Sequence, residues 1–134
     1  MKGSLMPVAS WSTTSLLVSA DTPVWVTASE FKLKSLRHSY GFFRAGFDVR
    51  AQVLKSDGAI GLWLEARPAA KLYRFVSAWS DESAQWAMVK ANPHREIMTH
   101  YRPLIEWSRL ASWTVEAAAL PMSWELAEAQ FVRK

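Results

Sequence analysis

The stretch Lys71–Tyr101 constrains the fold most, because it passes directly from a strand pattern into a helix pattern. Its first part, Leu72–Trp79, is rich in aromatic and branched residues, which is typical of a strand. Ser80-Asp81-Glu82 then supplies a polar N-cap and acidic residues for a first helical turn. Asn92-Pro93 restarts the helix, with Asn as the cap and Pro at the first helical position. The stretch therefore predicts a strand followed by two helical pieces.

A short connection before this stretch predicts a β-hairpin. Ile60–Arg67 has a strand pattern, and only Pro68–Lys71 separates it from the next strand. A one-residue slip would exchange the two faces of the hairpin. With a four-residue turn, the predicted register pairs Glu65 with Arg74, Trp63 with Val76 and Leu64 with Phe75.

The remaining elements complete a β-α-β-β-α-β order. Pro23–Leu33 and Arg109–Glu116 read as the first and last strands, and Ser123 is a candidate cap for a short final helix or turn. A helix is expected over about Ser35–Ser56, where Gly41 and Gly46 mark either a break or a close packing contact. Its predicted apolar face consists of Leu36, Tyr40, Phe43, Phe47, Ala51 and Leu54.

This order predicts an α+β, ferredoxin-like fold: a four-stranded antiparallel sheet with helices over one face. Residues 1–22 are expected to form an N-terminal arm, and residues 23–134 a single domain with a C-terminal extension. The uncovered sheet face would carry the apolar residues Trp63, Leu72, Val76 and Trp113. Such a face is too apolar to remain in contact with water, so we expect a homodimer.

Composition excludes several classes of function. The chain has no cysteine, so it has neither disulfides nor thiolate metal sites, and we expect a cytoplasmic protein. Its net charge of +4 is spread along the chain, which argues against a nucleic-acid partner. No apolar run is long enough for a membrane span. Eight tryptophans in 134 residues favour a large aromatic pocket, a subunit interface or a bulky core.

The run FVSAWSDESAQW…NPHREIM resembles the third strand and second helix of the antibiotic-biosynthesis-monooxygenase-like superfamily. The ending SRLASWTVEAAALPMSWELAEAQF also resembles the spheroidene-monooxygenase branch. The resemblance implies a dimeric α+β barrel with a pocket between each sheet and its helices. It covers oxygenases with or without haem, polyketide cyclases and members with no known activity, so it does not fix the reaction.

Haem-degrading members of the superfamily use an Asn on the first strand, a Trp at the end of the third strand and a His on the second helix. Trp79 resembles that Trp, and His94 and His100 are the two candidates for the His, although the spacing matches neither closely. No Asn lies on the first strand, whose middle carries Thr27 and Ser29. The set is incomplete, which argues against haem degradation. The cofactor stays unknown, either none or haem, and His94 or His100 would be a metal ligand only if haem is bound.

His94 and Trp79 are the candidate catalytic residues. A neutral imidazole can accept a proton or bind iron, and a helix start favours the neutral form. The alternative is a solvated histidine at a helix end. The candidate ligand-binding residues are Phe43, Phe47, Tyr73, Phe75, Trp86, Met98 and Tyr101, which otherwise form an ordinary aromatic core.

Two functions remain open from the sequence. One is a small oxygenase-like enzyme that acts on a hydrophobic aromatic, polyketide or isoprenoid substrate in a pocket between sheet and helices. The other is a non-redox polyketide cyclase or a ligand-binding dimer without catalysis.

Overall fold

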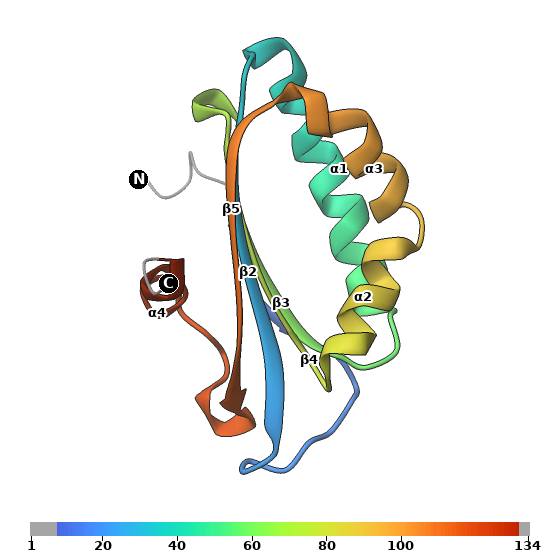
Figure 1. The fold of residues 1–134 in the computed structure, drawn as a ribbon, viewed down its shortest axis with the longest axis vertical. Helices are drawn as coiled ribbons and strands as arrows, with labels where there is room; N and C mark the ends of the chain where they lie inside the picture. The colour runs from blue at the N-terminus through green and yellow to red at the C-terminus, as the bar shows by residue number, and fades with distance from the viewer. Residues whose placement is uncertain (1–7, 132–134) are drawn as a thin grey trace.

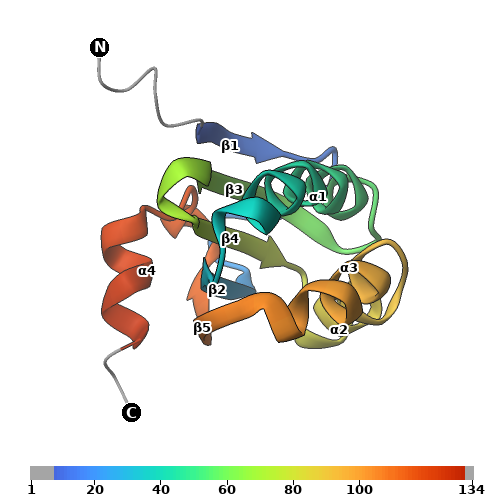
Figure 2. The same ribbon diagram turned by 90° about the horizontal axis from the view of Figure 1, so that it is seen from above.

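An antiparallel sheet separates three helices on one face from a single helix on the other (Figures 1 and 2). The computed structural model describes residues 8–131. The strands are β1 (Val8–Thr13), β2 (Pro23–Leu33), β3 (Ala59–Arg67), β4 (Leu72–Trp79) and β5 (Ile105–Glu116). The helices are α1 (Leu36–Leu54), α2 (Glu82–Lys90), α3 (His94–Tyr101) and α4 (Trp124–Phe131). Within residues 8–131, no helix is long and apolar enough to cross a membrane.

The sheet has five strands in the order β1-β3-β4-β2-β5, so the predicted count of four strands was wrong. The extra strand, β1, comes from the predicted N-terminal arm and pairs with β3. Residues 1–7 of that arm lie outside the described residues. The predicted hairpin register is confirmed, since Glu65 pairs with Arg74, Trp63 with Val76 and Leu64 with Phe75.

The helix starts follow from local chemistry. Ser35 caps α1 by accepting a hydrogen bond from the Arg37 amide, and Asp81 caps α2 by accepting one from the Ala84 amide. α3 differs from the prediction: Pro93 itself is the N-cap, and the Asn92 side chain donates to Glu96 instead of capping the helix.

The buried face of α1 is rotated from the predicted one. Leu36, Tyr40 and Phe47 are exposed, and Phe47 keeps 39% of its surface in solvent. The buried positions are Ser39, Phe42, Ala45, Gly46 and Val53. The predicted face is wrong because small residues let α1 pack closely against its neighbours. The helix runs through Gly41 and Gly46 without a break. A Cβ atom at Gly46 would lie 3.4 Å from the Phe75 ring, and one at Gly41 would lie 2.6 Å from the Tyr101 hydroxyl.

The two faces of the sheet belong to separate cores. On β2, Trp25, Thr27, Ser29 and Phe31 alternate with Val24, Val26, Ala28 and Glu30. The first set faces α1, α2 and α3, and we call this the inner face. The second set faces α4 on the outer face. The predicted apolar face is this outer face: Val76 is buried there, and Trp63 and Trp113 pack around it.

α4 is held on the outer face by both rings and charges. Trp124 stacks on Trp63 with ring centroids 6.0 Å apart. Arg74 lies 4.9 Å from the Trp124 ring, and Arg109 lies 4.5 Å from the Phe131 ring. The predicted C-terminal extension is therefore a packed part of the fold.

Candidate functional site

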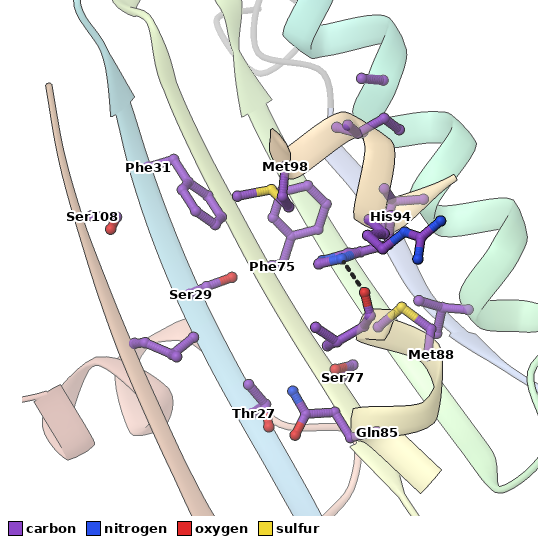
Figure 3. A pocket seen from close by; sticks show the side chains of 18 of the residues that line it. Thr27, Ser29, Phe31, Phe75, Ser77, Gln85, Met88, His94, Met98 and Ser108 are labelled. Atoms are coloured by element: carbon purple, nitrogen blue, oxygen red, sulfur yellow. Dashed lines mark hydrogen bonds between the residues drawn. The ribbon is translucent and has the colours of Figure 1, made fainter. Parts of the chain in front are cut away.

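A cavity of about 680 Å³ lies between the inner sheet face and the helices α1, α2 and α3. A volume of this size is typical of sites for small organic ligands. Most of its wall is apolar, formed on the helix side by residues such as Phe42, Val49 and Met88. Side chains of β2, β4 and β5 form its floor (Figure 3). Leu110 on β5 lines the cavity with 62% of its surface exposed, so the cavity opens toward this edge of the sheet.

The floor carries a row of hydroxyl groups across three strands. Thr27 on β2 pairs in register with Ser77 on β4 and with Ser112 on β5. The Thr27 and Ser112 hydroxyls are 3.1 Å apart and hydrogen-bonded. Ser29 lies two residues further along β2 and also lines the cavity. The alternation of β2 therefore contributes two of the hydroxyls on this floor.

Trp79 lies on the same inner face, two residues beyond Ser77 on β4, but it does not line the cavity. It is fully buried against Leu62 and Met88. Its indole Nε1–H donates to the Ser77 hydroxyl oxygen at 2.9 Å. This bond occupies one lone pair of the oxygen, so the Ser77 hydroxyl keeps its O–H donor and a second lone pair for a ligand.

Gln85 on α2 adds an amide donor beside Thr27 (Figure 3). Its side chain is buried, and its Oε1 accepts a hydrogen bond of 3.0 Å from the indole nitrogen of Trp25. Because the indole can only donate, this bond fixes which end of the amide carries the oxygen. The NH₂ end of Gln85 is then available to the cavity.

His94 faces the floor from the first turn of α3 (Figure 3). Its Nδ1 lies 3.2 Å from the carbonyl oxygen of Val89. Burial lowers the pKa of His94, and the hydrogen bond to Val89 opposes this only in part. A neutral imidazole must donate to a carbonyl, so Nδ1 carries the proton and Nε2 keeps its lone pair. The ring therefore offers the cavity a proton acceptor or metal ligand.

Gln52 on α1 holds the helix junction that positions His94. Its Nε2 donates to the carbonyls of Met88 and Ala91 at 3.0 and 3.3 Å, and its Oε1 accepts from the His94 amide at 2.9 Å. One side chain thus satisfies the open end of α2 and the open start of α3. The sequence carries no signal for this role, because Gln52 lies far from α3 along the chain.

The predicted site residues divide into two groups in the structure. His94, Phe75, Trp86 and Met98 line the cavity. The others do not: Phe43 and Phe47 pack on each other, Tyr73 is buried against Ser39, Tyr101 packs on Phe42, and Trp79 packs against Leu62 and Met88. His100 also stays outside the lining and packs against the Tyr101 ring.

The polar residues of the cavity were not predicted as ligands. The sequence pattern places Thr27 and Ser29 in the middle of a strand and predicts no role for Ser77 and Gln85. A signal was present in the alternation, because Thr27, Ser29 and Ser77 share the strand face of aromatic neighbours.

Haem is the cofactor that the superfamily resemblance leaves open, and the cavity residues fit it. His94 offers Nε2 for the iron while Nδ1 donates to a backbone carbonyl, a common arrangement for metal-binding histidines. Arg95 and Arg102 line the cavity and carry charge suited to the carboxylates of haem. Within residues 8–131, no group of three or more His, Cys, Asp or Glu side chains is placed to hold a metal ion by itself.

The fold and the cavity together define a class: α+β proteins whose helices enclose a small-molecule cavity against one face of an antiparallel sheet. No protein-family model and no curated protein sequence matches this chain. Solved structures do match it.

Several of these structures are monooxygenase-like proteins of the predicted superfamily. A candidate antibiotic biosynthesis monooxygenase from Nitrosomonas europaea has a TM-score of 0.60 and 10% identity, over 81% of this chain and all of the other. SnoaB of Streptomyces nogalater, a cofactor-independent oxygenase, has a TM-score of 0.52 and 15% identity, over 75% of this chain and 98% of its own. The predicted superfamily resemblance is confirmed at the level of the fold. The spheroidene-monooxygenase branch stays a prediction.

A third match differs in length. A candidate monooxygenase from Fusobacterium nucleatum has a TM-score of 0.66 and 10% identity, over 80% of this chain but only 48% of its own. A candidate monooxygenase from Lactobacillus acidophilus is covered to 51%. The present chain thus spans about half the length of these two proteins.

Proposed function

We propose that the protein is a small oxygenase-like enzyme that acts on a hydrophobic aromatic, polyketide or isoprenoid substrate in the cavity. The observation that carries the proposal is the imidazole of His94, whose Nδ1 bond to Val89 leaves Nε2 directed at the cavity. The likeness to monooxygenase structures supports the same class of reaction, although it concerns the fold only.

The cavity has the groups that deprotonation of a phenol or enol requires. His94 Nε2 accepts the hydroxyl proton, and the apolar walls exclude water. The oxyanion that forms is stabilised by donors of the floor and of α2, namely the Ser77 hydroxyl and the Gln85 amide. These donors are held by indole nitrogens before the substrate binds, so they need little rearrangement.

Such an oxyanion is electron-rich enough to react with dioxygen directly. For a phenol with a free ring position, one oxygen atom enters the ring and the other leaves as water, giving a quinone. The substrate then supplies all four electrons that dioxygen accepts. If haem is bound, His94 would hold the iron, and haem would supply redox chemistry in place of the substrate anion.

A non-redox cyclase or a ligand-binding module is the second candidate. The same base and the same donors would generate and hold an enolate, which can close a ring on a polyketide without oxygen. The observation that favours this reading is the hydroxyl row, because it supplies donors along the floor where an extended polyketide carries several carbonyl groups.

One experiment separates these functions. The absorption spectrum with hemin and the uptake of oxygen with 1-naphthol are measured for the parent, His94→Ala and His100→Ala. His100 lies on the same helix outside the cavity lining, so His100→Ala is the matched control. We expect only His94→Ala to lose oxygen uptake or the hemin spectrum. If both variants match the parent in both measurements, the enzyme proposal fails and the binding module replaces it.

A homodimer and a cytoplasmic location belong to the proposal as predictions. The homodimer was expected through the outer sheet face, and α4 covers part of that face. A second copy would therefore pack beside α4 or displace it. Light scattering at micromolar concentration should give twice the chain mass of 15.2 kDa, and a monomer would remove this part of the proposal.

A further inference from the structure

The charged residues that line the cavity all have the same sign. Lys90, Arg95, Arg102 and Arg109 line it, and no aspartate or glutamate does. Arg109 is committed to the outer face, where it pairs with Glu30 and Glu128. In residues 8–131, the other three cations form no ion pair. Their charge is therefore available to a ligand.

Two of these cations lie on one side of α3 and the turn that follows it. Arg95 and Arg102 are seven residues apart, with Met98 and Thr99 between them, and all four line the cavity. Residues spaced in this way share one helix face. Both arginines are exposed, so they lie at the mouth of the cavity while Met98 continues into its apolar wall.

We infer that the cavity takes an anionic amphiphile: an apolar ring system inside, with a carboxylate at the mouth held by Arg95 and Arg102. This inference rests on the proposed function and names the class of its substrate. A planar guanidinium can donate two parallel hydrogen bonds to a carboxylate, which a neutral substrate cannot accept with the same strength. The absence of acidic residues from the lining means that no protein group competes for these arginines.

The test uses two probes of nearly the same shape, one anionic and one neutral. 6-Hydroxy-2-naphthoate carries a phenol at one end and a carboxylate at the other, and 6-hydroxy-2-naphthamide is its neutral counterpart. Calorimetry at low salt should give a Kd for the carboxylate that is roughly tenfold lower than that of the amide. The difference should shrink in 0.5 M salt, because the arginines are exposed.

Substitutions of Arg95 and Arg102 test whether the arginines at the cavity mouth cause this difference in affinity. Arg95→Gln and Arg102→Gln should each weaken the carboxylate by roughly threefold to tenfold and leave the amide unchanged. Arg37→Gln is the control, since Arg37 lies at the start of α1 outside the cavity lining. Equal affinity for the two probes, or a carboxylate affinity that neither variant changes, would overturn the inference.

Failure of this inference and failure of the proposed function give different experimental results. If the amide binds as tightly as the carboxylate while oxygen uptake still depends on His94, the charge inference falls and the enzyme stands. If the carboxylate binds through Arg95 and Arg102 without oxygen uptake, the anionic site stands and the enzyme falls. Hemin also carries carboxylates, so its titration against the same variants shows whether the mouth serves haem or a substrate.

Discussion

Arg74 is the residue whose loss should damage the fold most through charge alone. It lies at the centre of a row of ion pairs on the outer sheet face. Its Nε is 2.8 Å from Glu30 Oε2, and its Nη1 is 3.0 Å from Glu65 Oε1. Its side chain is 18% exposed and that of Glu30 only 3%. Burial opposes the charge of Arg74, yet the two glutamates outweigh it and raise the pKa of the guanidinium.

We expect Arg74→Met to destabilise the protein by about 3.5–4 kcal/mol. Removing one partner of a buried ion pair costs roughly 3–5 kcal/mol, because the other charge stays buried without compensation. The lower end of this range applies because, in the variant, Glu30 is still paired with Arg109 and Glu65 is still paired with Arg67. The lost contact with the Trp124 ring adds about 0.5–1 kcal/mol. Domains of this kind have only about 5–15 kcal/mol of stability in total.

Urea unfolding followed by tryptophan fluorescence measures this change, with Arg67→Met as the matched control. Arg67 also pairs with Glu65, but it ends the row with 35% of its side chain exposed, so its loss should cost less than about 1 kcal/mol. The double variant Arg74→Met/Glu65→Leu should recover part of the loss, because it removes one of the stranded charges. Equal unfolding free energies for Arg74→Met and Arg67→Met would refute the reasoning.

Three further predictions concern the cavity. The NMR titration of His94 should give a pKa below the ordinary value of about 6.5. The unfolded chain then binds the proton first as the pH falls, so the free energy of unfolding should decrease below about pH 6.5 and level off below the folded pKa; an unshifted titration would contradict the burial of His94. Gln52→Leu should cost about 1–3 kcal/mol in urea unfolding and should also shift the ring resonances of His94, because it removes the hydrogen bonds of the α2–α3 junction. If the ring resonances of His94 do not shift, Gln52 contributes to stability but does not position His94. Trp79→Phe should cost about 1 kcal/mol by losing the bond to Ser77, whereas Trp79→Ala should cost about 3–5 kcal/mol. Similar losses in the two variants would show that the hydrogen bond, and not the volume of the ring, dominates.

The hairpin could be predicted in register because a local signal determined it. The four residues Pro68–Lys71 leave little freedom in how β3 meets β4. β1 had no such signal, because Val8–Thr13 is short and rich in serine and threonine. It is stabilised instead by non-local contacts. Trp11 packs over Gly61 of β3, where a Cβ atom would lie only 2.6 Å from the indole ring.

Of the residues predicted to line the cavity, Phe75, Trp86, His94 and Met98 do so, and all four lie on β4, α2 and α3. None of those predicted on α1 does. The large apolar residues Phe43 and Phe47 predict a buried stripe on their own side of α1. Successive helical positions turn by about 100°, however, and the stripe that is actually buried is centred on other residues. Ser39 and Gly46 face the sheet because small side chains let α1 approach it closely. The Ser39 hydroxyl reaches the Tyr73 hydroxyl at 2.7 Å, which also takes Tyr73 out of the cavity. A hydrophobic pattern gives small or polar residues such as these little weight, so it predicts the wrong face of α1 as the buried one.

The position of α4 follows from the charges of the outer face as well as from its apolar residues. Glu30 is buried in the middle of β2 and needs cations, which Arg74 and Arg109 supply from the neighbouring strands. The flat faces of these two guanidinium groups are then left uncovered. Trp124 and Phe131 of α4 cover one each, and Glu128 between them binds Arg109 at 3.0 Å. Because Trp124 and Phe131 lie seven residues apart, one helix face reaches both arginines. The chain therefore provides its own cover for the part of the sheet where an incoming subunit would have to desolvate charge.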